Sequence, residues 1–341
     1  VVGSNQKALL QQGYLRIGKD FPVFLHPKSK EEYALARTER KVGPLHTDFD
    51  CDVHPSITLE QDLFRRDLTI NAIAQDEAGA LIDPYGGQED LKAKILRHVS
   101  PAFKEDPLRV LRVARFAARF PDFSVDISTM KVMREMAQSK LLEGLTPERV
   151  CEETKKALST KNPDRYFELL NDINVNIQLW PELKKDDTKR LRSWMSDTNP
   201  VHSFTVLTAS LNLEELSSLT KRLRFPVIYE QMSSLTMKIY KVDLSKASAA
   251  DIVNTLYELD AFRAHERFKE ASRLAISLKR LNENSLEVSN RWPTYLEEAA
   301  AVNASSVDSS FVGAAIGKEI RRLQIERIYQ FKITQNSVRE D

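Results

Sequence analysis

The sequence predicts an α+β protein in which the strands are confined to the first hundred residues. Two observations support this prediction. Residues 1–99 mix short apolar segments of alternating or continuous pattern with helical segments. Beyond residue 99 the apolar residues recur at helical spacing, and no further strand is expected. With 341 residues, of which 42% are hydrophobic, the chain can bury the cores of several regions.

The first elements follow directly from local pattern. SNQKALLQQ predicts a helix, and YLRIG, FPVFLH and EEYALART predict strands. Residues 39–57 contain Gly, Pro and many polar residues, so we expect a long loop there. Thr58 and Gln61 then have the spacing of a capping box, which predicts a short helix that ends near Arg65.

The next elements complete the strand-containing part. Two strands joined by a turn at DEAG are predicted at INAIAQ and ALID. A loop that enters a helix is expected at PYGGQEDLKAK, and a last strand near residue 99 at ILRHV. Helices are expected after that, over residues 107–120, 127–141, 146–158, 163–171 and onward to about 332.

Overall charge and cysteine content exclude little. Lys and Arg number 50 against 49 Asp and Glu, so a nucleic-acid partner would have to be held by local basic faces. Cys51 and Cys151 lie far apart and show no metal-ligand spacing, which fits a reducing cytoplasm. No apolar run approaches the ~20 residues that a membrane span needs, so a cytoplasmic protein is expected.

The stretch EDPLRVLRVARFAARF, residues 105–120, gathers its charges on one face. At ~100° per residue, five of its charged side chains fall within an arc of about 120°. They are Glu105, Arg109, Arg112, Arg115 and Arg119. Planar guanidiniums aligned in this way suit bidentate recognition of phosphates and base edges. Asp106 followed by Pro107 is also an ordinary start of a helix, and the two roles are compatible.

A second polar cluster lies in FRRDLTINAIAQDEAGALIDPYGG. Arg65, Arg66 and Asp67 stand where a helix ends and a strand begins, so their side chains could reach a ligand from a rigid backbone. Taken alone, the two arginines could equally serve as cations at a helix C-terminus.

RRDLTINA, IDPYGG and EDPLRVLRVARFAARF occur in one order and spacing, and the chain resembles the bacterial class II CCA-adding enzymes, which are tRNA nucleotidyltransferases. The resemblance continues through HVSPAF, LTPERV, STKNPDRYFELL, LWPEL and KRLRFP, over most of residues 1–226. It implies a nucleotidyltransferase palm, with a mixed sheet and helices, followed by an all-α neck, body and tail. The regions expected are a palm at 1–99, a neck at 100–160, a body at 161–250 and a tRNA-binding tail at 251–341.

The resemblance also implies an activity. The enzyme would add or repair the 3′-terminal CCA of tRNA with CTP and ATP, without an RNA template and with Mg²⁺ as cofactor. A poly(A) polymerase shares the RRD and ED-R motifs, but the net charge of +1 and the lack of a basic tail disfavour it. A catalytically inactive RNA-binding protein is the alternative of another class, and no protein partner is inferred.

Roles for the RRD motif come from the same resemblance. It places Arg66 on the triphosphate and Asp67 near the ribose of the incoming nucleotide, with Asn71 as support.

In the ED-R helix, the Asp106 carboxylate would accept a hydrogen bond from the exocyclic amine of cytosine or adenine. Arg109 would donate a hydrogen bond to the adjacent ring acceptor. Arg112 and Arg115 would bind phosphates, and Glu105 belongs to the same motif. Cytosine and adenine both carry an amine at that position, whereas uracil and guanine carry a carbonyl.

The metal ligands expected by resemblance are a GG-x-x-RD turn and a DxD pair, which would precede Val1. Glu32 matches a third carboxylate and is the catalytic candidate, with Arg37 beside it. One carboxylate cannot hold two metals, so residues 1–341 alone are expected to bind substrates weakly without catalysing addition. The run DFDCDVH falls in the predicted loop and is interpreted as a solvated acidic segment.

Two features of the helical part complete the expectations. Beyond residue 100 the only histidines are His202 and His265, and neither is followed by Asp, so no HD phosphohydrolase domain is expected. The segment GKEIRRLQIERIYQFK predicts an amphipathic basic helix, which fits either a tRNA contact or a solvated face.

Overall fold

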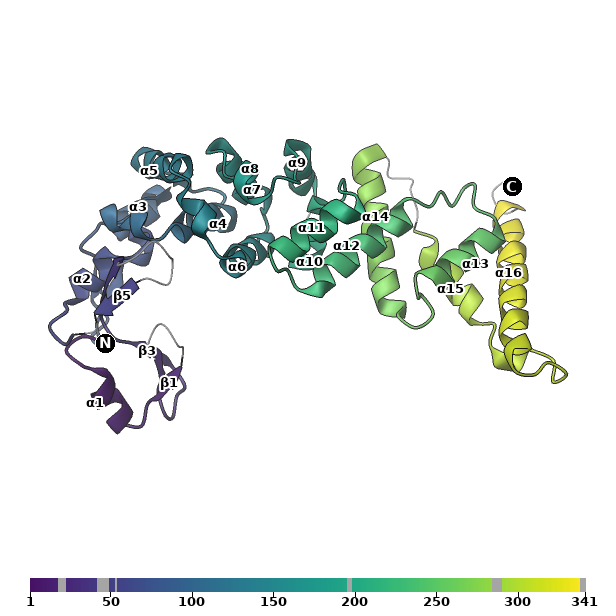
Figure 1. Ribbon diagram of the computed structural model, residues 1–341, viewed down its shortest axis with the longest axis horizontal. Helices are drawn as coiled ribbons and strands as arrows, with labels where there is room; N and C mark the ends of the chain where they lie inside the picture. The colour runs from purple at the N-terminus through teal and green to yellow at the C-terminus, as the bar shows by residue number, and fades with distance from the viewer. Residues whose placement is uncertain (18–22, 42–48, 53, 195–197, 284–289, 338–341) are drawn as a thin grey trace. The chain divides into compact units, whose positions relative to one another are not determined.

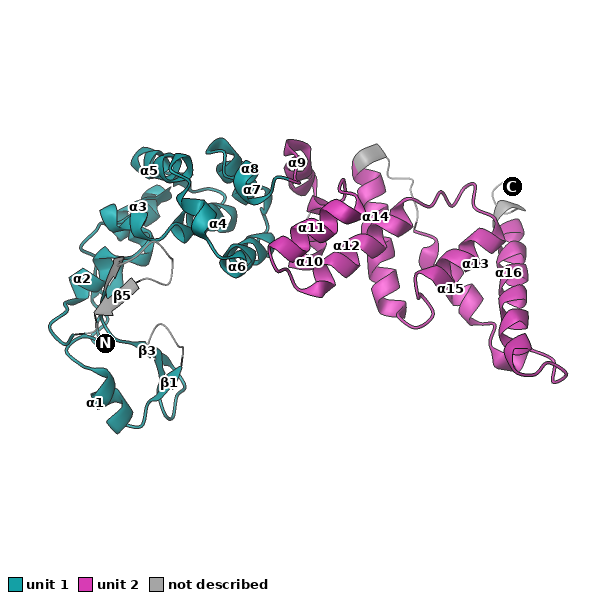
Figure 2. Ribbon diagram, viewed as in Figure 1, with its two compact units in different colours: residues 1–181 teal, residues 182–341 magenta. Residues whose placement is uncertain are grey.

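The computed structural model describes residues 1–17, 23–41, 49–52, 54–194, 198–283 and 290–337. It divides into two compact units, Val1–Pro181 and Glu182–Asp341 (Figure 2). All the strands that the structure describes lie in the first unit, and helices make up the second (Figure 1). The predicted α+β class is confirmed, whereas the division into four regions stays a prediction.

The chain begins as its pattern predicts. Helix α1 (Gln6–Gln11) precedes three antiparallel strands in the order β1 (Leu15–Ile17), β2 (Val23–Leu25) and β3 (Glu32–Ala34). Phe24, in the central strand, is opposite Arg16 and Tyr33. Its fully buried ring forms a small core with Leu9 and Leu35. This core fixes the strand that carries Glu32.

The prediction of one long loop over residues 39–57 is partly wrong. Strand β4 (Thr38–Lys41) pairs in antiparallel fashion with β5 (Phe49–Asp52). The sequences TERK and FDCD are mostly polar, and strand pairing is made by the backbone, so an apolar pattern could not reveal it. Asp48 and the rest of residues 42–48 lie outside the described part of the chain.

Helix α2 (Leu59–Phe64) confirms the predicted capping box. Thr58 Oγ1 accepts from Gln61 N at 3.2 Å, and Gln61 Oε1 accepts from Thr58 N at 2.9 Å. The strand predicted at INAIAQ shortens to β6 (Ala74–Gln75), because Thr69–Asn71 forms a 3₁₀ turn, η1. The remaining elements are β7 (Leu81–Ile82), which pairs with β6, α3 (Gly87–Ala93) and β8 (Ile95–Leu96).

The expectation that strands end near residue 99 is wrong. Strand β8 pairs in parallel with β9 (Ser124–Val125). A strand of two residues is too short to leave an alternating pattern, so it could not be predicted from periodicity. This pairing ties the strand-containing part of the unit to its helical part.

Helix α4 (Leu108–Arg119) is the centre of the helical part of the first unit. It packs against α6 (Pro147–Leu158) and α7 (Asp164–Asp172). Val110, Val113 and Ala114 are fully buried on its apolar side. The other elements here are η2 (Pro101–Glu105), α5 (Ile127–Gln138), η3 (Leu141–Gly144) and α8 (Asn176–Leu179). The buried apolar side of α4 therefore fixes the orientation of its charged side.

The second unit contains helices throughout its described residues. They are α9 (Lys185–Ser193), α10 (Pro200–Leu207), α11 (Leu213–Arg222), α12 (Val227–Tyr240), α13 (Ala249–Glu258), α14 (His265–Glu283), α15 (Trp292–Ala300), η4 (Ala304–Ser306) and α16 (Ala314–Ser337). Trp292, Leu296 and Ile328 belong to its main core. None of the helices described combines the length and apolar character that crossing a bilayer requires.

Candidate active site

Asp67 is the buried centre of the candidate site. Only 6% of the residue is exposed. Its Oδ1 accepts hydrogen bonds from Leu68 N at 2.9 Å and Asn71 Nδ2 at 3.0 Å. Its Oδ2 accepts from Arg112 Nε at 2.7 Å and lies 2.6 Å from Arg112 Nη2. The end of the RRD motif, the η1 turn and helix α4 therefore meet at one carboxylate.

The ionised forms of Asp67 and Arg112 are both stabilised in this network. Burial alone would raise the pKa of Asp67, but Arg112 and the hydrogen bonds from Asn71 and Leu68 outweigh it and bring the pKa below its ordinary value. Burial alone would lower the pKa of Arg112, and Asp67 and Glu153 raise it instead. The Arg112 side chain keeps 34% of its surface exposed, so its outer edge can still meet an anionic ligand.

Glu153 extends this network onto α6. Its side chain is buried, and its Oε2 lies 2.5 Å from Arg115 Nε. Its Oε1 lies 3.9 Å from Arg112 Nη1 and 3.6 Å from Lys156 Nζ. With Asp67 included, three cations face two carboxylates, which leaves one positive charge in excess. A partly buried surface with this excess attracts phosphate groups.

The two arginines of the RRD motif differ in their surroundings. Arg65, at the C-terminus of α2, binds Asp62 Oδ1 through Nη2 at 2.6 Å and donates from Nε to Arg37 O at 2.9 Å. Arg66 binds Asp62 Oδ2 at 3.1 Å, and 45% of its side chain is exposed. Arg65 thus fastens the helix end, while Arg66 is the more accessible of the two.

Asp106 has a structural role and a charged partner at once. Its Oδ1 accepts from Leu108 N at 3.1 Å at the start of α4. Its Oδ2 accepts from Arg149 Nη2 at 2.8 Å. Arg149 lies on α6 in the LTPERV segment and is not among the residues predicted from the sequence. Its spacing from Glu153, one helical turn, was the available signal.

Arg109 lies between two backbone segments. Only 7% of the residue is exposed. Its Nη1 donates to Ala102 O and its Nη2 to Arg65 O, both at 2.6 Å. The guanidinium therefore joins the η2 turn to the end of α2. The base contact predicted for Arg109 would have to be made in addition to these bonds or in exchange for them.

The predicted residues fall into two groups. Asp67, Asn71, Arg112 and Arg115 form one connected network that includes Glu153, through the hydrogen bonds and ion pairs given above. The remaining candidates are Arg66 at the end of α2, Glu105 and Asp106 before α4, Arg109 within it, and Glu32 exposed on β3. Their individual roles in nucleotide binding stay predictions.

Two family models match the chain. Residues 5–97 match the poly A polymerase head domain, and residues 122–187 match the probable RNA and SrmB-binding site of polymerase A. A CCA-adding enzyme of Coxiella burnetii is 38% identical over 335 residues, which cover 96% of this chain and 88% of that protein. The chain belongs to the CCA-adding enzyme family. This confirms the family predicted by resemblance.

Other members of the CCA-adding enzyme family and solved structures agree. A multifunctional CCA protein of Haemophilus influenzae is 43% identical, covering 79% of this chain and 76% of its own. The structure of a CCA-adding enzyme in apo form II has a TM-score of 0.67 at 19% identity, covering 98% of this chain and 83% of that one. The Thermotoga maritima CCA-adding enzyme complexed with tRNA_CCA has a TM-score of 0.61 at 20% identity, covering 95% and 79%. These structures support the fold.

Nucleotidyltransferases of this superfamily generally use divalent metal ions. Within the described residues, no three His, Cys, Asp or Glu side chains are grouped so that they could hold a metal ion. Glu32 is an exposed residue of β3, opposite Leu25 in the register of the sheet.

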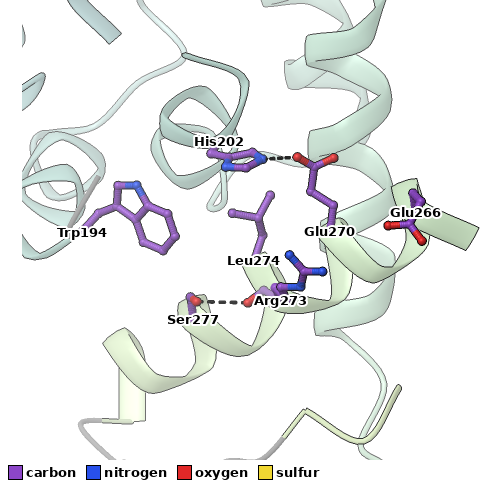
Figure 3. A pocket seen from close by; sticks show the side chains of 7 residues that line it. All are labelled: Trp194, His202, Glu266, Glu270, Arg273, Leu274 and Ser277. Atoms are coloured by element: carbon purple, nitrogen blue, oxygen red, sulfur yellow. Dashed lines mark hydrogen bonds and ion pairs between the residues drawn. The ribbon is translucent and has the colours of Figure 1, made fainter. Parts of the chain in front are cut away.

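A separate cavity lies within the second unit (Figure 3). Its lining residues are Trp194, His202, Glu266, Glu270, Arg273, Leu274 and Ser277. His202 Nε2, from α10, lies 2.5 Å from Glu270 Oε1 of α14. The carboxylate next to His202 therefore comes from Glu270 on another helix and not from an aspartate adjacent in the sequence. The predicted lack of an HD phosphohydrolase activity stays a prediction.

The last helix, α16, has an amphipathic arrangement. Ile328 is buried, and Arg321 and Arg322 are exposed. Arg322 pairs with Glu319 and Glu326, so part of this basic face is neutralised within the helix. A tRNA contact by this face stays a prediction.

Proposed function

We propose that the protein is a tRNA nucleotidyltransferase that adds or repairs the 3′-terminal CCA of tRNA with CTP and ATP, without an RNA template. The observation that carries the proposal is the 38% identity, over 96% of the chain, to a protein named as a CCA-adding enzyme. The cationic network at the junction of α2, α4 and α6 supports it, because a nucleoside triphosphate needs such a surface.

In the proposed reaction, the 3′-hydroxyl of the tRNA attacks the α-phosphorus of the nucleotide. A new P–O bond forms, the bond to the β-phosphate oxygen breaks, pyrophosphate leaves and the hydroxyl proton is released to solvent. Arg66, Arg112 and Arg115 would neutralise phosphate charge, and Asp67 would orient Arg112 and the ribose. Asn71 would hold Asp67 in place through the bond that it already makes.

Selection of the base would rest on the start of α4. Asp106 would accept a hydrogen bond from the exocyclic amine that cytosine and adenine both carry. Arg109 would donate a hydrogen bond to the ring acceptor next to that amine. Arg149 supports this proposal, because it binds one oxygen of Asp106 and so fixes the direction of the carboxylate. Mg²⁺ is the divalent ion proposed, with Glu32 as a candidate ligand, and a cytoplasmic location is proposed with it.

The proposal is tested by incorporation into defined tRNA acceptors. Purified protein, extended at its N-terminus by the GG-x-x-RD and DxD segment expected by resemblance, is incubated with Mg²⁺, labelled CTP or ATP, and tRNA lacking CCA, lacking CA or lacking only A. Addition of C to the first two acceptors and of A to the third is expected. Extension of oligo(A) with ATP alone would favour a poly(A) polymerase. Binding of tRNA without incorporation of either nucleotide would favour the RNA-binding alternative.

A further inference from the structure

A second cavity of the second unit, with a volume of about 370 Å³, is distinct from the one in Figure 3. It is lined by parts of α9, α12 and α14 and by the chain that joins α10 to α11. Leu211, Met237 and Leu278 are buried and give it an apolar wall, which the ring of Tyr240 extends. A cavity of this size and lining can hold a small organic molecule.

The charged part of this lining is cationic. Arg190, in the last turn of α9, and Lys241, at the C-terminus of α12, both line the cavity. None of the nine described residues that line it has an acidic side chain. Lys241 is exposed and pairs with no acidic residue in the described part of the chain. The cavity therefore favours an anion.

Arg190 is held in position by a buried carboxylate. Asp187 is 1% exposed, and its Oδ1 accepts from Arg190 Nη1 at 3.2 Å and from Ser210 Oγ. Arg190 Nη1 also donates to Val206 O at 3.2 Å. The Nε and Nη2 donors of Arg190 have no partner among the described residues. Two adjacent donors on a fixed guanidinium suit bidentate binding of a phosphate.

The helix dipole alone accounts for a single cation at the C-terminus of α9 or of α12. It does not account for the buried Asp187, which orders two side chains of the cavity wall, Arg190 and Ser210. Nor does it account for two helices ending with a cation at the same cavity. This arrangement points to a ligand.

The balance of charge around the cavity indicates the kind of anion. Lys279 Nζ lies 5.8 Å from the centre of the Tyr240 ring. Arg190, Lys241 and Lys279 carry three positive charges, and Asp187 offsets one of them. The remaining excess of two matches a phosphate monoester, which carries a charge of about −2 near neutral pH.

Two polar side chains at the cavity have hydrogen-bonding capacity to spare. Asn212 Oδ1 accepts from Glu214 N and Glu215 N, both at 2.9 Å, and its Nδ2 donates to no described residue. Ser210 Oγ donates to Asp187, so its lone pairs remain as acceptors. One donor and one acceptor beside the cations suit the hydroxyl groups of a sugar.

We propose that this cavity is a second nucleotide site, which binds a free nucleoside monophosphate. The phosphate lies on Arg190 and Lys241, the sugar beside Ser210 and Asn212, and the base against Tyr240 and the apolar wall. The site goes beyond the proposed function, because all its residues belong to the second unit and its occupation requires no incorporation into tRNA.

Met237 provides a local measurement of binding. It is one of six methionines in the chain and lines the cavity. The whole chain is labelled at the methionine methyl carbons, and the NMR signal that disappears in Met237→Leu is assigned to Met237. Titration with AMP or CMP should shift this signal to saturation and give Kd. Met133 and Met136, buried in the first unit, are internal references.

The variants separate a phosphate site from a merely apolar cavity. Arg190→Lys keeps a charge beside Asp187 but loses the two adjacent donors, and Lys241→Met removes the second cation. Each should raise Kd for AMP on the order of tenfold, because each removes a hydrogen bond between charged groups. Ala209→Leu fills the cavity and should abolish the shift. Lys238→Met is the matched control, since Lys238 is exposed on α12 and does not line this cavity.

Adenosine and inorganic phosphate, tested separately, should each bind at least about tenfold more weakly than AMP, because each lacks one half of the contacts. Adenosine binding as tightly as AMP, or equal Kd values in Lys241→Met and Lys238→Met, would overturn the proposal. So would a Met237 signal that shifts with tRNA but not with AMP or CMP, since the cavity would then serve RNA and not a free nucleotide. If Arg190→Lys does not fold, Lys241→Met and Ala209→Leu decide the question.

Discussion

Asp67 and Arg112 lie 45 residues apart in the sequence and form a direct ion pair, with Asp67 Oδ2 2.6 Å from Arg112 Nη2. The pair joins the end of the RRD motif to the middle of α4. Because Asp67 is buried, its charge depends on this partner for compensation. The two motifs that carry the family resemblance are therefore one structural unit.

Replacing Arg112 by Met should destabilise the first unit as well as weaken nucleotide binding. The change leaves Asp67 charged and buried with only neutral donors, at a cost of about 3 kcal/mol in the free energy of unfolding. Urea denaturation measures this cost. The double variant Arg112→Met with Asp67→Asn should regain part of the stability but none of the nucleotide affinity. Additive losses in the double variant would mean that the two side chains are not coupled.

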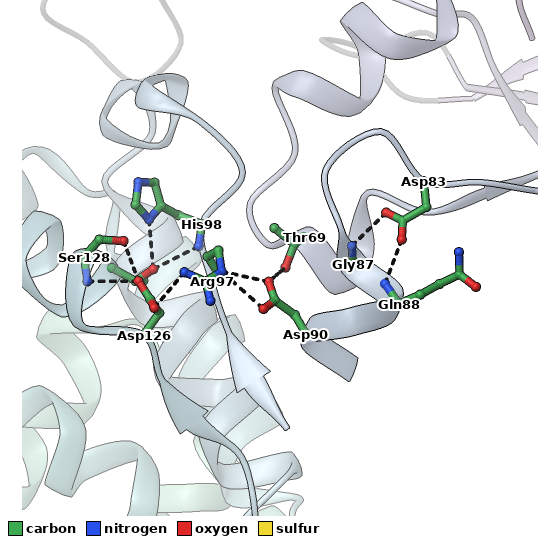
Figure 4. Close-up of polar contacts among 10 residues, drawn as sticks. Thr69, Asp83, Gly87, Gln88, Asp90, Arg97, His98, Asp126 and Ser128 are labelled. Atoms are coloured by element: carbon green, nitrogen blue, oxygen red, sulfur yellow. Dashed lines mark hydrogen bonds and ion pairs between the residues drawn. The ribbon is translucent and has the colours of Figure 1, made fainter. Parts of the chain in front are cut away.

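Gly87→Ala tests the close approach of α3 to the η1 turn. The added methyl group would lie 2.2 Å from the backbone oxygen of Thr69 (Figure 4), which cannot rotate away, so α3 or the turn must shift. Overpacking of this kind costs about 1–3 kcal/mol, and nucleotide affinity should fall with it.

Gly144→Ala is the matched control for Gly87→Ala. A Cβ at Gly144 would meet nothing within 4 Å, so thermal stability and nucleotide affinity should be unchanged. If both alanine variants unfold at the same temperature as the original protein, the contact between Gly87 and Thr69 is not as close as described.

His98 should make stability depend on pH near neutrality. Burial lowers the pKa of His98 below its ordinary value of 6.5, and Asp126 only partly offsets this. The unfolded chain then takes up the proton at a higher pH than the folded one, so stability is lost as the pH falls from about 6.5 toward the folded pKa. Nδ1 of His98 is also 2.8 Å from Thr129 Oγ1, which a glutamine could still reach.

The measurement for His98 is urea denaturation at several values of pH between about 7.5 and 5, for the original protein and for His98→Gln. The original should lose more stability over this interval than the variant. Parallel curves for the two proteins would show that His98 has the same pKa in the folded and unfolded states.

Sequence pattern was informative where a local feature determines the structure. The helical spacing of residues 105–120 placed Arg112 and Arg115 on one face, and both do converge on buried carboxylates. The identity of those carboxylates did not follow, because Glu153 lies 38 residues from Arg115 and nothing local encodes the pairing. Strands β4, β5 and β9 were missed for a related reason: they are short, or polar, and are defined by partners elsewhere in the chain.

The roles assigned to Asp106 and Arg109 lead to the most specific prediction. Asp106→Ala should lower the preference for CTP and ATP over UTP and GTP, since loss of an ionic hydrogen-bond partner costs ~1.5 to 3 kcal/mol, on the order of tenfold to a hundredfold in discrimination. Asp106→Asn should go further toward UTP, because its amide can donate to a carbonyl where the carboxylate can only accept. Incorporation of each of the four nucleotides measures these preferences.

Two further variants separate base recognition from support. Arg149→Met removes the partner of one Asp106 oxygen, so it should raise KM for CTP and ATP and reduce the preference for them over UTP and GTP by less than Asp106→Ala does, because the carboxylate itself remains. Arg109→Ala should reduce selectivity and also destabilise the protein, because the guanidinium joins Ala102 O to Arg65 O in the buried interior. Measuring stability beside selectivity keeps the two effects apart.

If Asp106→Ala and Arg109→Ala both incorporate the four nucleotides in the original ratio, the bases are recognised elsewhere in the protein, and the carboxylate of Asp106 serves only to start α4 and to bind Arg149.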